Sequence, residues 1–224
     1  MADSNKGNMD GVIRVMIVDD HPTVREGLAH RIESQGDMTV CGEAADVDDA
    51  LRKVPRFQPD VVIVDIALKN SDGLELIKLL KNRCKEVRSL VHSMYDEMIY
   101  ADRCLHAGAL GYLNKEADPD QVIAAIRMVA ADQVYLSPKM SGEILGRAVT
   151  GARSDVDPID TLTDRQLEVF RLMGEGKTAA NIGHCLHISV HTVETHRDNI
   201  KRTLRVGTIS ELTRLAVLWA SKTC

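Results

Sequence analysis

Residues 12–133 alternate between short apolar runs and segments whose apolar residues lie three or four positions apart. The apolar runs are Val12–Val18, Met38–Cys41, Val61–Ile66, Leu90–Ser93 and Gly111–Leu113. Between them, spacings such as that of Val24, Leu28 and Ile32 are typical of amphipathic helices. Alternating strands and helices predict an α/β domain with a five-stranded parallel, doubly wound sheet that is covered by helices on both faces.

Polar side chains stand at the carboxyl ends of four predicted strands. Asp19 and Asp20 follow the first strand, and Asp65 ends the third. Ser93 ends the fourth strand, and Lys115 follows the fifth. Right-handed crossovers bring these ends to one edge of the sheet, where open sheets of this kind bind ligands. The sequence therefore predicts a site that contains three carboxylates, a hydroxyl and a lysine.

Three carboxylates in one small pocket must hold a cation or have raised pKa values. Mg²⁺ prefers oxygen ligands, and a cation beside a carboxylate favours a phosphoryl group whose oxygens it can bridge. Lys115 would offset the remaining charge, and Ser93 would donate to a phosphoryl oxygen. The sequence has no glycine-rich P-loop that would hold a nucleotide. These residues predict that Asp65 attacks a phosphoryl donor and becomes an aspartyl phosphate.

The pocket residues resemble the receiver domain of two-component response regulators. The resemblance rests on the acidic pair, the acceptor Asp65, the hydroxyl of Ser93 and the Tyr112-x-x-Lys115 pattern, in the family's order. It implies that a sensor histidine kinase or a phosphotransfer protein supplies the phosphoryl group. One residue departs from the family pattern, because Lys69 stands where a proline is frequent.

The resemblance also implies a role for each pocket residue. Asp65 is the phosphoacceptor, and Lys115 pairs with the phosphoryl oxygens. Ser93 shifts toward the phosphoryl group, and Tyr112 then rotates inward and changes the surface formed by the fourth helix and the fifth strand. The groups expected to hold Mg²⁺ are Asp19, Asp20, Asp65 and the backbone carbonyl of Ala67.

Each pocket residue also has a simpler explanation when it is taken alone. Asp20 can cap a helix that begins near Pro22, and Ser93 can cap the helix that follows it. Tyr112 can be a core residue, and Lys115 can be a solvated charge. Their joint occurrence in the family's order favours the phosphoacceptor site, because single motif residues often match by chance.

Residues 134–159 interrupt the periodicity and predict a linker, in which SPKMSGEILGRAVTG can form a short helix. Residues 160–224 predict a small all-α domain. A short helix over Ala179–Leu186 and a longer helix capped by Ser189 are joined by a tight turn. This arrangement, with basic residues on the longer helix, predicts a helix-turn-helix.

The helix-turn-helix resembles the LuxR-type DNA-binding domain, and with the receiver the whole chain resembles a NarL/FixJ-type response regulator. The matching patterns are LTxRQxEV, SxxTVxTHRxNI and a final apolar helix. The resemblance implies binding to double-stranded DNA and an active homodimer that pairs through the final helix. The residues expected to contact DNA are Ser189, His191, Thr192, Glu194, Thr195, His196, Arg197, Asp198, Lys201 and Arg202.

Acidic residues occupy positions that point at base edges in related domains. Glu194 is expected to accept a hydrogen bond from cytosine N4, the major-groove donor that suits a carboxylate. Alternatively, Glu194 pairs with Arg197 and Asp198 pairs with Arg202 at helical spacings. The longer helix can also belong to a dimerisation module whose basic face is only solvated, which is the usual explanation of such a face.

Composition narrows the class of protein. The net charge of −5 does not suggest nucleic-acid binding, but the acidic excess precedes residue 151 and the remainder is nearly neutral. No apolar run reaches the roughly 18 residues of a membrane span, and the polar start lacks a signal-peptide core. Five scattered cysteines without a CxxC pair fit a reducing compartment. We therefore expect a cytoplasmic protein that does not bind membranes.

Together these features predict a phosphorylation-dependent transcription regulator rather than an enzyme. Its only expected chemistry is its own phosphorylation and dephosphorylation at Asp65. One alternative is an aspartate-based phosphotransferase or phosphatase. The other is a DNA-binding regulator whose receiver is an unphosphorylated docking module. Phosphatases of the haloacid dehalogenase type carry a DxD at the end of the first strand, so the adjacent Asp19 and Asp20 disfavour the first alternative.

Overall fold

The computed structural model of the chain describes residues 11–68, 72–150, 158–186 and 188–223. The chain divides into two compact units, Met1–Ile144 and Leu145–Cys224. Lys69, which departs from the receiver pattern, lies outside the described residues. None of the helices within the described residues is long and apolar enough to cross a lipid bilayer.

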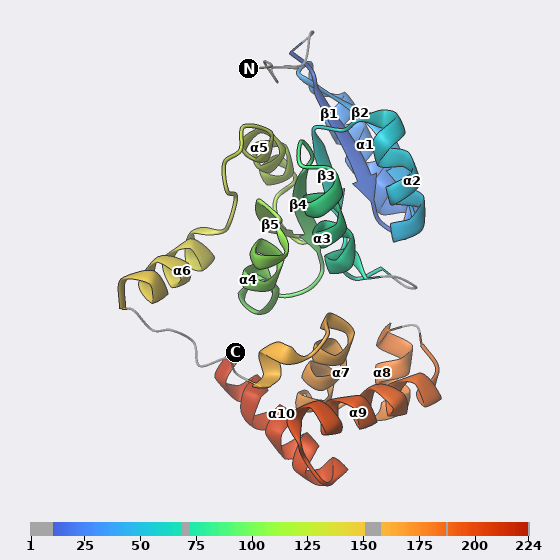
Figure 1. The fold of residues 1–224 in the computed structure, drawn as a ribbon, viewed down its shortest axis with the longest axis vertical. Helices are drawn as coiled ribbons and strands as arrows, with labels where there is room; N and C mark the ends of the chain where they lie inside the picture. Colours follow the sequence, from blue (N-terminus) through green and yellow to red (C-terminus); the bar gives the residue numbers. More distant parts are fainter. Residues whose placement is uncertain (1–10, 69–71, 151–157, 187, 224) are drawn as a thin grey trace. The chain divides into compact units, whose positions relative to one another are not determined.

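The first unit contains a five-stranded sheet with the order β2-β1-β3-β4-β5 (Figure 1). All four ladders between neighbouring strands are parallel. The predicted fold class is therefore confirmed, and the strand order places β1 and β3 side by side near the middle of the sheet. The strands are β1 (Ile13–Val18), β2 (Met38–Ala44), β3 (Val61–Val64), β4 (Arg88–Ser93) and β5 (Gly111–Asn114).

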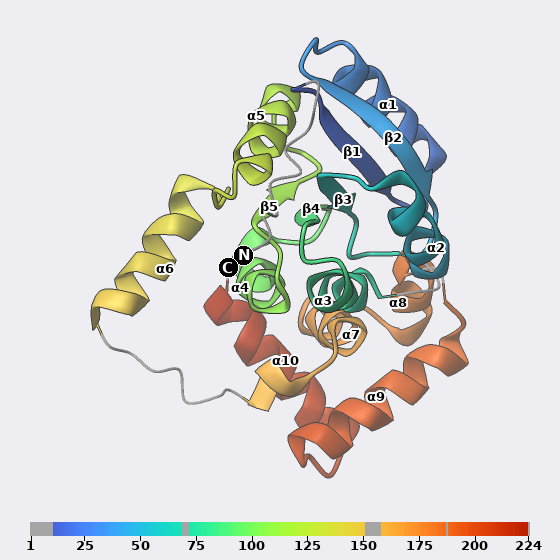
Figure 2. The same cartoon turned by 45° about the horizontal axis from the view of Figure 1, so that its top comes forward.

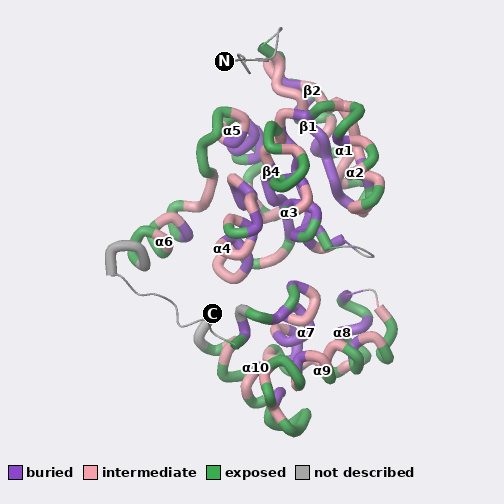
Figure 3. Tube along the Cα trace, in the orientation of Figure 1, coloured by how far each residue is buried: buried purple, intermediate pink, exposed green. Residues whose placement is uncertain are grey.

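Helices cover both faces of this sheet (Figure 2). Alternate apolar residues of the strands pack with buried residues of α1 and α5 in one core cluster. Helices α2, α3 and α4 contact one another in series and cover the other face. Figure 3 shows β1, β3 and β4 as mostly buried between these layers, whereas most residues of the edge strand β2 are only half-buried. The helices are α1 (Pro22–Glu33), α2 (Val47–Phe57), α3 (Gly73–Arg83), α4 (Glu97–Ala107) and α5 (Pro119–Ala130).

The carboxyl ends of the second and third strands differ from the prediction for a physical reason in each case. The second strand was expected to end at Cys41 but continues to Ala44, because the register with β1 shifts and leaves Cys41 as an extra residue. Such a bulge lets an edge strand continue through residues of low strand propensity. The third strand was expected to end at Asp65 but ends one residue earlier, at Val64. There the Asp65 side chain accepts a hydrogen bond from the backbone N–H of Ala67 and turns the chain out of the ladder.

The helix caps contradict two of the simpler explanations. The N-cap of α1 is His21, without a side-chain capping bond, so Asp20 does not cap this helix. The N-cap of α4 is Asp96, whose carboxylate accepts a hydrogen bond from the N–H of Met98 at 2.8 Å. Ser93 therefore does not cap α4. An aspartate cap satisfies an otherwise unpaired N–H of the first helical turn as well as a serine does.

The second unit is all-helical. The capping box of Thr163 and Gln166 is present at the start of α7, with both reciprocal hydrogen bonds made. Its core is built from α7, α9 and α10, where Phe170 and Trp219 lie 5.8 Å apart between ring centroids. The elements are η1 (Pro158–Thr161), α7 (Asp164–Gly174), α8 (Ala179–Leu186), α9 (Val190–Leu204) and α10 (Ile209–Thr223).

The turn between α8 and α9 depends on a close backbone approach. The N–H of Ile188 donates to the carbonyl of Gly183 at 2.9 Å. A Cβ at Gly183 would lie 2.8 Å from the carbonyl oxygen of Ile188, so only glycine fits there. The two helices therefore meet at a tight turn, as the helix-turn-helix prediction requires.

Helix α6 (Pro138–Thr150) occupies part of the segment predicted as a linker. The side chain of Met140, in the first turn of α6, is fully buried in the first unit. The linker segment is therefore partly packed against the sheet domain rather than extended along its whole length.

Candidate functional site

The carboxyl ends of the strands bring the predicted pocket residues together. Asp19 follows β1 and Asp65 follows β3, and the two residues are only 2% and 1% exposed. Ser93, the last residue of β4, is fully buried. Lys115 follows β5, and its N–H donates to the carbonyl of Ser93 at 2.9 Å. Four polar groups from four strands therefore share one small site.

Lys115 bridges the two buried carboxylates. Its Nζ lies 2.6 Å from Asp19 Oδ2 and 2.6 Å from Asp65 Oδ2. Burial lowers the pKa of Lys115, but the neighbouring carboxylates outweigh this effect and hold the pKa above its usual value. The side chain of Lys115 is only 9% exposed, so Lys115 is a largely buried cation rather than the solvated charge of the simpler explanation.

Asp65 is held at both carboxylate oxygens. Ser93 Oγ donates to Asp65 Oδ1 at 3.0 Å, and the N–H of Ala67 donates to the same oxygen at 2.8 Å. Burial raises the pKa of Asp65 above its ordinary value, although Lys115 opposes this rise. Gly73 packs directly against the backbone of Asp65, because a Cβ there would lie 2.2 Å from the Asp65 carbonyl oxygen. The carboxylate is thus fixed in place by hydrogen bonds and by the lysine.

The acidic pocket has the donor set of a cation site. Asp19, Asp20, His21 and Asp65 each offer one ligand atom, and these atoms lie within 4.8 Å of one another. Three of the four donors are carboxylate oxygens, which are the ligands that Mg²⁺ prefers. The residues therefore fit the cation that the sequence predicts.

Tyr112 lies inward, beneath the loop between β4 and α4. Its side chain is buried, and its hydroxyl donates to the carbonyl of Tyr95 at 2.9 Å. Asn114 Nδ2 donates to the same carbonyl at 3.2 Å. The ring of Tyr95 stacks on that of Tyr100, with centroids 4.8 Å apart. Tyr112 is therefore a core residue, but one whose hydroxyl ties β5 to the segment that follows Ser93.

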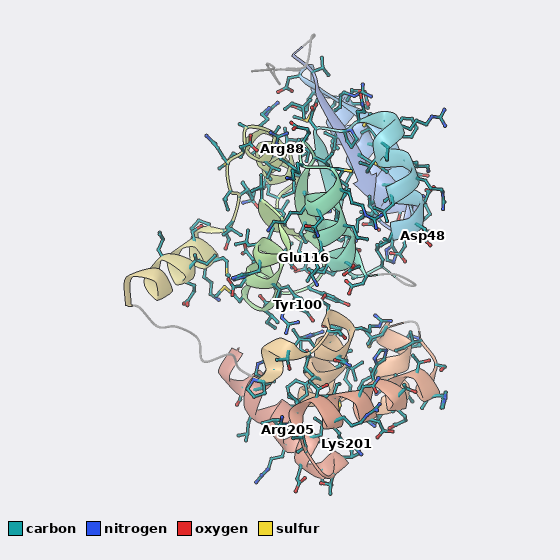
Figure 4. The ribbon with its side chains drawn as sticks, in the orientation of Figure 1. Asp48, Arg88, Tyr100, Glu116, Lys201 and Arg205 are labelled. Carbon is teal, nitrogen blue, oxygen red and sulfur yellow. The ribbon has the colours of Figure 1, made fainter. Side chains whose placement is uncertain are left out.

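The predicted DNA-contacting residues lie on α9 or at its cap. Ser189 caps the helix by accepting a hydrogen bond from the N–H of Thr192 at 3.0 Å. Figure 4 shows Lys201 on the last turn of α9 and Arg205 just beyond it. The exposed members are Ser189, His191, Glu194, Thr195, Asp198 and Arg202, and the half-buried ones are Thr192, His196, Arg197 and Lys201.

The acidic residues of α9 pair within the helix. Arg197 Nη1 lies 2.9 Å from Glu194 Oε1, which is the first of the two alternative pairs. The second pair differs from the prediction, because Asp198 contacts Lys201 Nζ at 3.2 Å instead of Arg202. Arg202 instead donates to the side chain of Asn199. Spacings of three and four both bring side chains together on a helix, and Asn199 competes for the arginine.

Comparison with known proteins places the chain in a family. The model of the response regulator receiver domain matches residues 15–127, and the model of the luxR family of bacterial regulatory proteins matches residues 160–216. The chain belongs to the LuxR-type response regulators. The transcriptional regulatory protein LiaR of Bacillus subtilis is 35% identical over 208 residues, which cover 92% of this chain and 96% of LiaR. The oxygen regulatory protein NreC of Staphylococcus carnosus is 33% identical, over 92% of this chain and 97% of NreC.

Solved response regulators share the fold. A LuxR-family two-component response regulator from Aurantimonas is 34% identical, with a TM-score of 0.57 over 62% of this chain and 99% of that protein. RcsB from Salmonella enterica, solved on a promoter with the phosphomimetic BeF₃⁻, has a TM-score of 0.57 over 91% of this chain and 97% of that chain. RcsB is 23% identical, so its likeness concerns the fold alone.

Membership in the response regulators settles the class of protein. The family consists of DNA-binding transcription regulators rather than catalytic enzymes, so the phosphatase alternative is rejected. A DNA-binding role for the helix-turn-helix is likewise established at the level of the family, in place of the purely structural module. In this family the acidic cluster of Asp19, Asp20 and Asp65 is consistent with a phosphorylation site.

Two histidines near the response-regulator pocket were missed by the sequence reasoning. His21 Nδ1 lies 3.0 Å from Asp20 Oδ1 and 3.3 Å from Asp19 Oδ1. His92 is buried, and burial together with the charge of Lys115 lowers its pKa to about 4, so it is neutral. Adjacency to the acidic pair was a usable signal for His21. His92 gave no such signal, because it stands within an apolar strand.

Proposed function

We propose that this response regulator controls transcription through phosphorylation of Asp65 by a sensor histidine kinase or a phosphotransfer protein. The observation that carries the proposal is the position of the Asp65 carboxylate between Ser93 Oγ at 3.0 Å and Lys115 Nζ at 2.6 Å. A hydroxyl donor and a buried cation at these distances are placed to stabilise charge on a transferred phosphoryl group. The same groups also hold the nucleophile in one orientation.

In the transfer step, an oxygen of Asp65 forms a bond to phosphorus while the bond from phosphorus to the donor breaks. The donor nitrogen or oxygen leaves with the bonding electron pair. Lys115 and Ser93 then turn from the carboxylate to the phosphoryl oxygens. We assign the Mg²⁺ site to Asp19, Asp20, Asp65 and the carbonyl of Ala67, and bound Mg²⁺ would neutralise charge on those oxygens.

The shift of Ser93 is relayed to Tyr112 in this proposal. Ser93 and Tyr95 belong to one short segment, and the Tyr95 carbonyl accepts the hydroxyl of Tyr112. Ordering this segment therefore favours the inward position of Tyr112. The surface made by α4 and β5 then has one defined shape when Asp65 is phosphorylated.

The active form is proposed to be a homodimer on double-stranded DNA, with α10 at the contact. Two apolar residues of α10, Leu212 and Ala216, are buried within their own unit, where α10 packs on α7, and are not available for pairing. The exposed apolar residues of α10 are instead Ile209, Val217 and Leu218. We expect these three residues to meet the second copy. We also propose that the protein works in the cytoplasm, where it would meet both its phosphoryl donor and DNA.

The function is tested by DNA affinity in two phosphorylation states of the full chain. Acetyl phosphate with Mg²⁺ is expected to tighten binding to a selected site by roughly 5- to 150-fold, the usual range of allosteric coupling. The Asp65→Asn variant is expected to show no such change, since its amide oxygen is a poor nucleophile. Equal affinity of phosphorylated and unphosphorylated wild type would instead support the alternative in which the receiver is only a docking module.

Glu194 is proposed to specify a cytosine in each half-site, while its ion pair with Arg197 orients that arginine. Selection of sites from random DNA by the Glu194→Ala variant should lose this preference, because a good base contact discriminates by about 1–3 kcal/mol. Asp198→Ala removes the neighbouring acidic side chain and should leave the cytosine preference intact. If Glu194→Ala selects the same sites as wild type with only altered affinity, Glu194 reads no base and only orients Arg197.

A further inference from the structure

The segment that follows α5 adds to the edge of the receiver sheet. Tyr135 forms a parallel bridge with Gly111: the N–H of Tyr135 donates to the Leu110 carbonyl at 2.9 Å. The N–H of Tyr112 then donates to the Tyr135 carbonyl at 3.0 Å. A Cβ at Gly111 would lie 3.0 Å from that same carbonyl oxygen, so glycine permits the close approach. We call residues 133–140 the strap.

The strap is also fastened to α4. The N–H of Ser137 donates to Glu97 Oε1 at 2.9 Å, and Glu97 is the first residue of α4. Ser137 Oγ in turn accepts a hydrogen bond from the N–H of Met140 at 3.1 Å, within the first turn of α6. The side chain of Met140 is fully buried. The start of α6 is therefore fixed to the receiver through one carboxylate and one backbone bridge.

The strap is attached to the short segment 93–97, which also connects Ser93 with the carbonyl that holds Tyr112. Ser93 reaches the acceptor Asp65, and two residues later the Tyr95 carbonyl holds the hydroxyl of Tyr112. Two residues after that, Glu97 holds the strap. Tyr112 touches the strap directly as well, through its own N–H. The structure thus records an inward Tyr112 and a fastened strap together.

We propose that the strap couples the state of Asp65 to α6, and so to the chain that leads to the DNA-binding unit. When Tyr112 leaves its place, the Tyr95 carbonyl keeps only the weaker hydrogen bond from Asn114, and the first turn of α4 is loosened. Glu97 then moves away from Ser137, and the first turn of α6 loses its anchor. Phosphorylation reverses this sequence. The direction of the signal rests on the proposed function, but the anchoring of α6 by Glu97 does not.

Hydrogen exchange of the full chain tests the anchor. In the Glu97→Ala variant, the amides of residues 140–146 are expected to exchange about tenfold faster than in wild type, because a hydrogen bond to a charged group is lost. Glu75→Ala is the matched control, since Glu75 also lies in the first turn of a helix, α3, behind an aspartate N-cap. It should leave exchange in α6 unchanged. Glu97→Gln keeps an acceptor oxygen and should retain most of the protection.

Equal exchange of residues 140–146 in wild type and Glu97→Ala would refute the anchoring of α6 by Glu97, whether or not Asp65 is phosphorylated. The coupling has a second readout, with intact mass reporting the phosphoryl adduct in the same samples. Acetyl phosphate with Mg²⁺ should slow exchange in α6 of wild type but not of Glu97→Ala, while both proteins gain the adduct. An adduct without slower exchange in wild type would refute the coupling. If wild type gains no adduct, the proposed function is refuted and the coupling with it. The anchoring of α6 is tested separately, by hydrogen exchange of unphosphorylated wild type and Glu97→Ala.

Discussion

Replacement of Lys115 by methionine is expected to lower the free energy of unfolding of the receiver unit by about 3–5 kcal/mol at neutral pH, in buffer containing EDTA. Lys115 Nζ lies 2.6 Å from a carboxylate oxygen of both Asp19 and Asp65, and those side chains are only 3% and 2% exposed. Methionine keeps most of the side-chain volume but leaves both buried carboxylates without their cation. Urea denaturation followed by circular dichroism measures the loss in the full chain.

Three controls separate the lost charge from a general loss of packing. Lys115→Arg keeps the cation and should be less destabilising than Lys115→Met. Lys53→Met removes a lysine whose pair with Asp49 is only half-buried, with side chains 37% and 23% exposed, so its effect should be smaller than that of the buried pairs. Mg²⁺ should stabilise Lys115→Met more than wild type, because a bound cation compensates the same carboxylates. Equal losses in the Lys115 and Lys53 variants would show that the buried charges do not need Lys115.

The stability lost in Lys115→Met should also depend on pH, and the pKa of Asp65 determines the direction of this dependence. Burial raises the pKa of Asp65 in the folded protein, and Lys115 opposes that rise. Without Lys115 the folded-state pKa lies further above the unfolded-state value, so the folded form binds more protons and stability falls as the pH rises through that pKa. Measured in EDTA, Lys115→Met should therefore regain stability relative to wild type on acidification from neutral pH. A loss of constant size across this range would contradict the assignment.

Much of the receiver was predictable from the sequence, because its pattern is periodic. Alternating apolar runs predict a parallel sheet, and such a sheet gathers the residues at its strand ends. Asp19, Asp65, Ser93 and Lys115 therefore come together in the structure from positions far apart in the sequence. The capping box at Thr163 was predictable for a similar reason, since it is a contact between near neighbours.

The remaining features depend on geometry that no local pattern carries. The continuation of β2 past Cys41 needs a bulge in the ladder. The cap of α4 could not be chosen from the sequence, because Ser93 and Asp96 are both suitable cap residues, and the structure uses Asp96. Glu97 and Ser137 lie 40 residues apart, and their contact exists only because α4 and the strap flank the same strand. On α9, side-chain competition with Asn199 decided which pair Asp198 makes.

Intact mass after incubation with acetyl phosphate and Mg²⁺ tests the central claim, that Asp65 is the phosphoacceptor. Wild type should gain a single phosphoryl adduct, which EDTA prevents. Asp48→Asn, at an exposed aspartate on α2 (Figure 4), should gain the adduct like wild type. Asp65→Asn should gain none, because its amide oxygen is a poor nucleophile. An adduct that forms on Asp65→Asn at the wild-type rate would contradict the assignment.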